Sequence, residues 1–275
     1  ALEYNIPYVK GLKVKGTFIY DYNNYGYKAT RKGFKTYTYG EYTGEYTAAD
    51  ANYPALLQDN RRESERVDMQ FQTNYNRTFG NHTIGATYVF ERREEKANWM
   101  NGERKFDFFT IGELDNARES DQKVSGSSEH QAYLSHIGRL TYDYKGKYLF
   151  ETNGRYDGSS KFPKKNRFGF FPSVSVGWNI ARENFMKPVA GDWLSDLKLR
   201  GTWGQIGNQG IDPYKFVPTM SQVEKKDVAW LVNGAKPLTL NAPGLVSDSF
   251  TWETVATLDF GFDITALNGR LQSTF

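Results

Sequence analysis

The sequence contains no cysteine, which excludes disulfide frameworks, thiolate zinc sites and cysteine nucleophiles together. It also lacks any stretch near the roughly 18 to 20 consecutive apolar residues that a membrane-spanning helix needs. This excludes a helical membrane protein but not one that crosses a membrane with strands. The sequence also lacks a large excess of charge of either sign, because 35 basic and 32 acidic side chains leave a net charge of only +3. A nucleic-acid partner is therefore not expected.

Aromatic residues, by contrast, are abundant. The 275 residues include 19 Tyr, 19 Phe and 6 Trp, together 16% of the chain, and 26 Gly. Aromatic residues are enriched in strands, and glycine is typical of the tight turns that join them. With 39% hydrophobic and 24% charged residues, the composition is that of a folded protein. The composition therefore predicts a β-rich fold.

The clearest pattern is an alternation with a period of two between residues 130 and 162. Even positions such as Leu140 and Tyr142 are mostly apolar, whereas odd positions such as Arg139 and Asp143 are mostly polar. Successive side chains of a strand point to opposite faces of a sheet, so the pattern predicts strands with one apolar and one polar face. A Lys-Gly-Lys turn in the middle makes this segment a hairpin.

The same alternation predicts further strands within residues 12–22, 67–90, 170–180, 197–203 and 253–275. In total it predicts about nine amphipathic strands, many of which reach the roughly 9 to 11 residues that cross a bilayer at a tilt. Strands of soluble sandwiches are usually nearer 5 or 6 residues long. Strand length therefore favours a membrane-spanning sheet.

The connections between these strands alternate in length. Short turns follow the strands that end near Asn76, Tyr144 and Ile264, whereas long polar connections span 23–62, 93–129 and 205–250. Outer-membrane barrels combine short periplasmic turns with longer extracellular loops in this way. An odd number of strands closes no conventional bacterial barrel, and open sheet edges are not stable in lipid. We therefore expect the chain to be a piece of a larger antiparallel transmembrane β-barrel.

Several longer motifs are specific enough to suggest a family. They are RYDGSSKF at 155–162, NRFGFFPSVSVGW at 166–178, WLSDLKLR at 193–200, GQIGNQ at 204–209, TWET at 251–254 and LNGR at 267–270. With these motifs the sequence resembles the central part of the barrel of a SusC/RagA-like TonB-dependent outer-membrane transporter. The resemblance covers most of the chain and weakens in the long connections. It implies an all-β barrel of 22 strands, of which residues 1–275 form a part, with the plug domain and the remaining strands absent from this chain.

The resemblance also implies a function and partners. Such transporters import a large nutrient, typically an oligosaccharide and sometimes a peptide, across the outer membrane of a Bacteroidetes-type bacterium. They are not enzymes and need no cofactor. The expected partners are a SusD-like surface lipoprotein that acts as a lid, the TonB-ExbB-ExbD complex, which would act through the N-terminal region absent from this chain, and the surrounding outer-membrane lipid.

Two groups of residues are candidates for a functional site. The first is a mixed-charge row expected to face the barrel lumen: Arg139, Asp143, Glu151, Arg155, Asp157, Lys198, Arg200 and Asp259. These residues would contact plug or substrate, or simply form a water-filled wall of paired charges. The second group, Trp99, Trp230, Tyr37 and Tyr39, lies in the predicted extracellular loops. Contacts with ligand or lid and simple loop packing are both open for these four.

No residues are expected to act as a catalytic or metal site. The three histidines, His82, His130 and His136, are too scattered in the sequence for a metal cage, and no Ser/His/Asp arrangement is placed for hydrolysis. The alternative function is a soluble extracellular β-rich carbohydrate-binding module, which the hydrophilic average and the many aromatic residues favour. The two hypotheses differ in the apolar rows, which would face lipid in a transporter and form a buried core in a soluble module.

Overall fold

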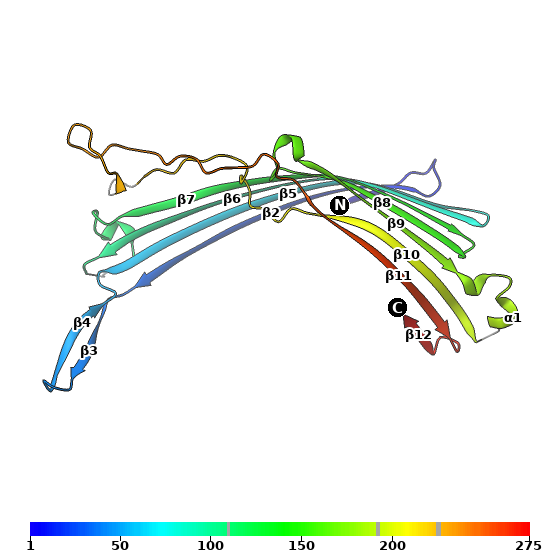
Figure 1. Ribbon diagram of the computed structural model, residues 1–275, viewed down its shortest axis with the longest axis horizontal. Coiled ribbons are helices and arrows are strands. Elements are labelled where there is room, and N and C mark those ends of the chain that lie inside the picture. The colour runs from blue at the N-terminus through cyan, green and yellow to red at the C-terminus, as the bar shows by residue number, and fades with distance from the viewer. Residues whose placement is uncertain (109–110, 191–192, 224–226) are drawn as a thin grey trace. The chain divides into compact units, whose positions relative to one another are not determined.

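Strands make up nearly all of the regular structure. The computed structural model describes residues 1–108, 111–190, 193–223 and 227–275. Ten strands of the described chain form one sheet, in the order β1-β2-β5-β6-β7-β8-β9-β10-β11-β12, and β3 and β4 pair as a separate hairpin (Figure 1). The prediction of an antiparallel, all-β sheet is confirmed.

The bounds of the elements follow the chain order. The strands are β1 (Leu2–Asn5), β2 (Leu12–Arg31), β3 (Phe34–Gly40), β4 (Glu45–Ala51), β5 (Ala55–Phe79), β6 (His82–Phe106), β7 (Lys123–Tyr144), β8 (Tyr148–Ser159), β9 (Phe168–Asn179), β10 (Leu194–Asn208), β11 (Glu253–Ala266) and β12 (Leu271–Thr274). The helical turns are η1 (Leu114–Asn116), η2 (Lys164–Asn166), η3 (Ile180–Arg182) and α1 (Lys187–Ala190). No helix in the described part of the chain is long and apolar enough to cross a membrane.

The chain divides into two compact units. Unit 1 comprises Ala1–Phe18, Asp68–Arg93 and Gln131–Phe275, and unit 2 comprises Ile19–Val67 and Glu94–His130. In unit 2, Leu57 and Phe106 form a small core with Ala55 and are almost completely buried. In unit 1, Leu194 and Ala266 form a second small core. The second core takes in the end of the apolar row of β11, at Ile264 and Ala266, and leaves most of the alternating apolar rows outside.

Two of the predicted long connections are wrong in extent. The strand β2 continues to Arg31 and β5 begins at Ala55, with the β3–β4 hairpin between them, so only a few residues of 23–62 are irregular. Likewise β6 continues to Phe106 and β7 begins at Lys123, within the predicted connection 93–129. Most side chains in these extensions are exposed or half-buried on both faces. Because these extensions have no continuous buried face, their sequences show no alternation by which a strand could be recognised. Strand β1 was not predicted either.

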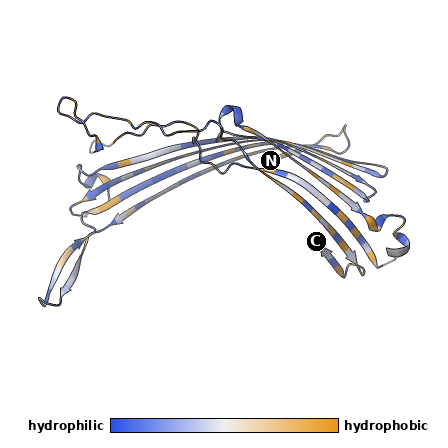
Figure 2. Cartoon of the chain, in the orientation of Figure 1, coloured by the Kyte–Doolittle hydropathy of each residue, from blue (hydrophilic) through white to orange (hydrophobic). Residues whose placement is uncertain are grey.

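The strand register sorts the side chains of unit 1 onto two faces. One row across the sheet runs Tyr142, Phe150, Val176, Gly201, Phe260, and the adjacent row runs Thr141, Glu151, Ser175, Thr202, Asp259. We call the sides that carry these rows the apolar face and the polar face. Figure 2 shows the resulting alternation of hydrophobic and hydrophilic residues along the strands.

The large side chains of the apolar face are exposed. The exposed fractions are 55% for Leu140, 63% for Leu258 and 74% for Phe260. A soluble module with these residues as its core would bury them, and leaving such side chains in water costs about 1.5 to 3 kcal/mol each. The exposure of these residues therefore argues against the alternative hypothesis of a soluble module, in which they would form a buried core.

A buried carboxylate ties two short turns of unit 1 together. The Glu183 side chain, just after η3, accepts hydrogen bonds from Lys147 Nζ at 2.9 Å and from Trp178 Nε1 at 3.2 Å. The Tyr148 hydroxyl is a third donor. These hydrogen bonds, of which that from Tyr148 has the largest effect, lower the pKa of Glu183 from 4.5 to about 2. The turn after β9 is thereby fixed to the start of β8.

This cluster predicts a pH-dependent stability. Because the pKa of Glu183 is lower in the folded protein, its ionised form stabilises the fold fully above pH 4.5, and this contribution is lost as the pH falls from 4.5 to about 2. We expect the free energy of unfolding of wild type to exceed that of E183Q at pH 7 and the difference to shrink towards pH 2. Denaturant titrations across this pH range measure it.

The variant K147Q serves as the control for this experiment. K147Q removes one of the hydrogen-bond donors to Glu183. The free energy of unfolding of K147Q should therefore depend on pH less than that of wild type, but still more than that of E183Q. A difference between wild type and E183Q that stays constant from pH 7 to pH 2 would contradict the proposed role of the carboxylate.

Candidate functional site

The polar face of unit 1 brings the predicted charged row together. The register places all eight residues on this face: Arg139 and Asp143 on β7, Glu151, Arg155 and Asp157 on β8, Lys198 and Arg200 on β10, and Asp259 on β11. They share a face because side chains alternate between the two faces of a sheet, and the register aligns the odd positions of β7, β8 and β11 with the even positions of β10. Whether this face lines a lumen stays a prediction.

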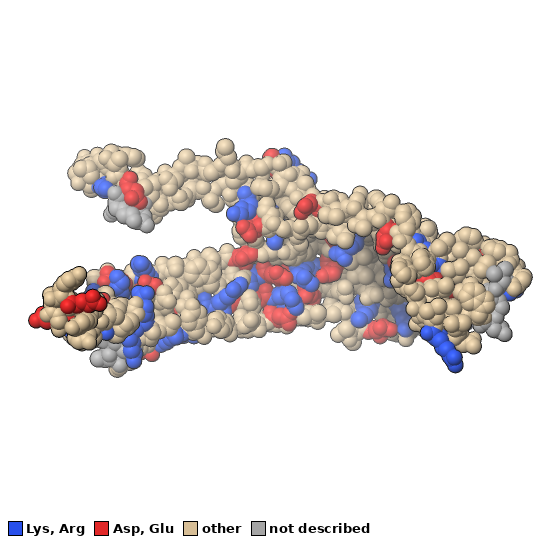
Figure 3. Space-filling model, turned by 60° about the horizontal axis from the view of Figure 1, so that its bottom comes forward, with Lys and Arg blue, Asp and Glu red and all other residues tan. Residues whose placement is uncertain are grey.

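The charges of the polar face largely compensate one another. Arg139 Nη2 lies 2.7 Å from Glu151 Oε2, and the Arg155 guanidinium holds the Asp157 carboxylate with two hydrogen bonds of 3.0 and 3.1 Å. On the face shown in Figure 3, basic and acidic side chains are likewise interspersed rather than segregated. Such pairs stabilise a wet surface only weakly, and they leave it without a strong field of either sign.

The other four residues make weaker contacts. The Lys198 ammonium and the Arg200 guanidinium both approach Asp263, at 3.8 and 3.7 Å. Asp143 accepts a hydrogen bond of 2.5 Å from the Gly146 amide and thus belongs to the β7–β8 turn. Asp259 is exposed, opposite Thr202 of β10.

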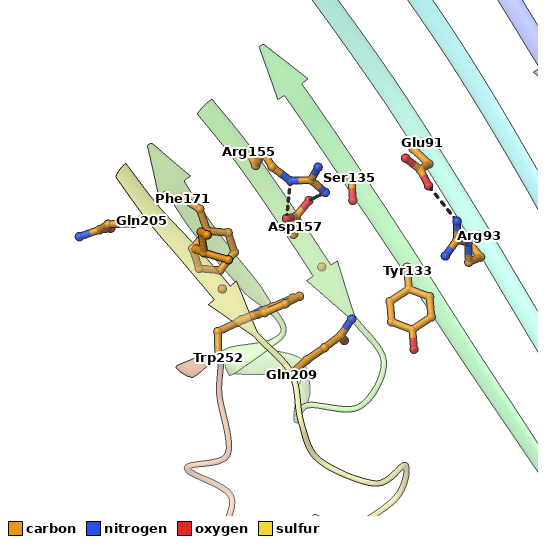
Figure 4. A pocket seen from close by; sticks show the side chains of 13 residues that line it. Glu91, Arg93, Tyr133, Ser135, Arg155, Asp157, Phe171, Gln205, Gln209 and Trp252 are labelled. Atoms are coloured by element: carbon orange, nitrogen blue, oxygen red, sulfur yellow. Dashed lines mark hydrogen bonds and ion pairs between the residues drawn. The ribbon is translucent and has the colours of Figure 1, made fainter. Parts of the chain in front are cut away.

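A pocket of about 380 Å³ opens in unit 1. It is lined by Glu91, Arg93, Tyr133, Ser135, Arg155, Asp157, Gly158, Phe171, Gln205, Ile206, Gly207, Gln209 and Trp252. In Figure 4 the side chain of Gln209 reaches between Trp252 and Tyr133, whereas that of Gln205 points away. The pocket combines an aromatic side with a charged side.

The aromatic side is built around Trp252. Its ring contacts Phe171 edge-on at a centroid distance of 5.3 Å and Phe162 at 5.3 Å, and its Nε1 donates to the Arg167 carbonyl at 3.0 Å. Phe162 and Phe171 are buried. The indole is therefore held in a fixed orientation and remains partly accessible.

Two glycines make room for these rings. A Cβ at Gly169 would lie 2.5 Å from the Phe171 ring and 2.9 Å from that of Trp252, and a Cβ at Gly207 would overlap the Phe171 ring. Any larger residue at either position would push the rings out of place. Because Gly169 and Gly207 have no side chains, the aromatic rings have room to form this side of the pocket.

The charged side consists of paired groups. Besides the Arg155–Asp157 pair, Arg93 contacts the buried Asp68 at 2.7 Å and Glu91 at 3.6 Å. Paired charges bind a further charged ligand poorly, because the ligand would have to compete with the existing partners. The accessible chemistry is an aromatic face beside polar groups, which suits an uncharged polar molecule.

Most residues that line the pocket were not predicted from the sequence. Arg155 and Asp157 were predicted, but Glu91, Arg93 and Trp252 were not named as site residues. Continuing the alternation of β6 beyond Phe90 would have placed positions 91 and 93 on the polar face. No local signal exists for the approach of Trp252, which precedes β11, to Phe171 of β9.

The four predicted loop aromatics are exposed, but three do not lie in loops. Trp99 belongs to β6, and Tyr37 and Tyr39 belong to β3; only Trp230 lies in an irregular segment. The loop assignment of these three is wrong, for the same reason as the extent of the connections. None of the four lines the pocket described above. The Tyr39 ring contacts that of Tyr46 across the hairpin at 5.1 Å.

The histidines lie in separate places. His82 Nδ1 is 2.7 Å from the Tyr142 hydroxyl, and His136 Nδ1 is 2.8 Å from the Tyr88 hydroxyl. His130 contacts Glu94 in unit 2. Among the residues that the structure describes, no three His, Cys, Asp or Glu side chains gather as a metal site would require.

Comparison with known sequences reveals a family likeness along the chain. The family model of the TonB dependent receptor-like β-barrel matches residues 6–275. TonB-dependent receptor P3 of Formosa agariphila is 32% identical over 205 residues, which are 73% of this chain and 20% of the relative. TonB-dependent receptor SusC of Bacteroides thetaiotaomicron is 40% identical over 139 residues, 50% of this chain and 14% of the relative. The chain thus spans a fifth or less of the length of these relatives.

Solved structures show the same fold. The RagAB peptide transporter matches with a TM-score of 0.79 at 20% identity, over 97% of this chain and 28% of the matched chain. The RagAB peptide importer in its closed-closed state matches with a TM-score of 0.78, also at 20% identity, over 97% of this chain and 27% of the matched one.

The glycine at 207 gives a direct test of the pocket. We expect G207A to lower the free energy of unfolding by roughly 1 to 3 kcal/mol, because the new methyl group displaces the Phe171 ring. The matched control is G138A, since a Cβ at Gly138 of β7 meets no atom within 4 Å. It should be neutral or stabilise by up to about 1 kcal/mol. Urea titration of the full-length variants in detergent measures both, and equal effects would contradict the close packing.

Proposed function

The chain belongs to the TonB dependent receptor-like β-barrel family, and we propose that it forms part of a transporter that imports a large nutrient. The observation that carries this proposal is the family match over residues 6–275. Members of this family are outer-membrane β-barrel receptors and not enzymes, so the chain lies in the bacterial outer membrane. Import itself is an activity of the whole protein, of which this chain is a part.

The two faces of unit 1 suit this placement. We propose that the exposed apolar face contacts lipid and that the polar face lines the lumen. The short turns then lie on the periplasmic side and the long connections on the extracellular side. In this orientation the exposed side chains of Leu140, Leu258 and Phe260 contact lipid instead of water, which is energetically favourable.

We also propose that residues 1–275 are one portion of a 22-stranded barrel, whose remaining strands and plug belong to the rest of the protein. The sheet order begins with β1 and ends with β12, which are not paired with each other. In lipid each edge requires a further partner strand, because unpaired backbone groups are costly there. The small share of each relative that the chain covers supports the same view.

An oligosaccharide is the substrate that the pocket favours. The ring of Trp252 offers an aromatic face, Gln209 offers an amide, and the nearby charges are already paired. A peptide with charged termini would gain less from such a surface. We further propose that a SusD-like surface lipoprotein covers the extracellular end and that the TonB-ExbB-ExbD complex supplies energy through a part of the protein outside residues 1–275.

Uptake assays test the proposed activity. In a strain that lacks the native protein, we expect wild type to restore uptake of a labelled oligosaccharide, and W252A to raise the half-saturating concentration by up to about tenfold, because a stacking contact is lost. W252F keeps an aromatic ring and is the matched control. Restored uptake of labelled peptides alone would assign a peptide substrate instead, and restoration of neither would overturn the transport proposal.

Arginine substitutions test which face contacts lipid. We expect V176R, on the apolar face of β9, to reduce folding into the membrane by about 2 to 4 kcal/mol if the residue lies near the bilayer midplane. The neighbouring S175R lies on the polar face beside Glu151 and should assemble almost normally. The folded fraction recovered in outer-membrane preparations measures both. Equal assembly of the two variants would contradict the assignment of the faces.

A further inference from the structure

The connections at one end of unit 1 lie side by side in one row: the short turns β1–β2, β5–β6, β7–β8 and β11–β12, and the longer connection from β9 to β10. Backbone hydrogen bonds join neighbouring turns: Asn76 N to Gly11 O at 2.9 Å, Lys145 N to Asn81 O at 2.9 Å, Asn179 N to Lys147 O at 2.7 Å, and Leu267 N to Trp193 O at 2.6 Å. Side chains carried by successive turns are therefore neighbours, although they are far apart in the sequence.

These turns carry an excess of positive charge. We call the following seven residues the basic rim: Lys10, Arg77, Lys145, Lys147, Arg182, Lys187 and Arg270. Lys147 pairs with Glu183, but none of the other six forms an ion pair with a residue that the structure describes. All six are exposed.

The described carboxylates of the same turns are already engaged. Asp143 accepts a hydrogen bond from the Gly146 amide, Glu183 accepts one from Lys147, and Asp196 accepts one from the Asn179 side chain. The long connections differ, since Lys165 pairs there with Asp248 and Lys215 with Asp212. The rim thus presents cations whose charge its neighbours do not neutralise.

The rim borders a belt of aromatic side chains. Arg77 Cζ lies 4.6 Å from the centroid of the Phe79 ring, and Lys145 Nζ lies 5.5 Å from that of Tyr144. The Tyr144 ring stacks on Tyr148 at 6.2 Å, and Tyr148 is the register partner of Trp178 on the apolar face. Tyrosine and tryptophan are enriched at the level of lipid headgroups. The cations of the rim therefore lie where the apolar face ends.

We propose that the basic rim binds the phosphodiester headgroups of anionic glycerophospholipids in the periplasmic leaflet. Lysine and arginine close to an anionic membrane surface attract it, and a guanidinium matches a phosphate with two parallel hydrogen bonds. A Cβ at Gly146 would contact the Arg182 guanidinium, so Arg182 of the next connection lies against the turn that carries Lys145. The proposal rests on the outer-membrane location and on the proposed periplasmic side of the short turns. It does not rest on the transported substrate, so a negative uptake assay leaves it standing.

Lipid binding by the purified full-length protein tests this proposal. The protein is incubated in nonionic detergent with phosphatidylglycerol or phosphatidylcholine of the same acyl chains, and bound lipids are counted by native mass spectrometry. We expect wild type to retain more phosphatidylglycerol. The variant R77Q/K145Q/R182Q should retain less, by roughly fivefold per cation and at least tenfold for the three together.

The matched control is K164Q/K165Q/K215Q, which removes the same charge from the long connections. It should retain phosphatidylglycerol like wild type. Equal retention of the two lipids by wild type, or equal losses in the two triple variants, would overturn the proposal. Displacement of the lipid by inorganic phosphate would also overturn it, since the rim would then be a phosphate site. Circular dichroism checks folding, and K145Q alone replaces the triple variant if that variant does not fold.

Discussion

Backbone hydrogen bonding between neighbouring antiparallel strands is the constraint on which the rest of this structure depends. Inside a bilayer no water is available to the peptide groups, so each strand must satisfy its N–H and C=O groups with the next strand. Continuous pairing from β7 to β11 fixes one register across these strands. Once the register is set, the side of the sheet on which each side chain lies is set as well.

From this register follow both the apolar face and the polar face. The row with Phe150 and Val176 is mostly apolar, and the neighbouring row with Glu151 and Ser175 is polar. The Arg139–Glu151 ion pair joins adjacent strands that the register has already aligned, whereas Arg155 and Asp157 pair within β8. The pairing of these charges leaves the aromatic side of the pocket as the more selective surface.

How well each part of the structure could be predicted depends on how close together in the sequence the residues that determine it lie. The strands around Leu140 and Phe260 were predictable, because their apolar and polar side chains alternate with a period of two. The outer parts of β5 and β6 were not predictable, because only a few side chains there, such as Leu57 and Phe106, are buried and the rest follow no period of two. The pocket was the least predictable. It depends on Gly207 having no side chain at the place where Phe171 needs room, and on a tryptophan that lies 81 positions beyond that phenylalanine in the sequence.

The two ends of the strands differ because the connections alternate in length. A short turn is held by few residues, so its few side chains and their hydrogen bonds to the next turn determine the chemistry of that end. Long connections instead bring distant groups together, as when Trp252 reaches the carbonyl of Arg167. The same up-and-down topology therefore produces one end whose connections carry mostly basic side chains and another end whose connections bring residues far apart in the sequence together.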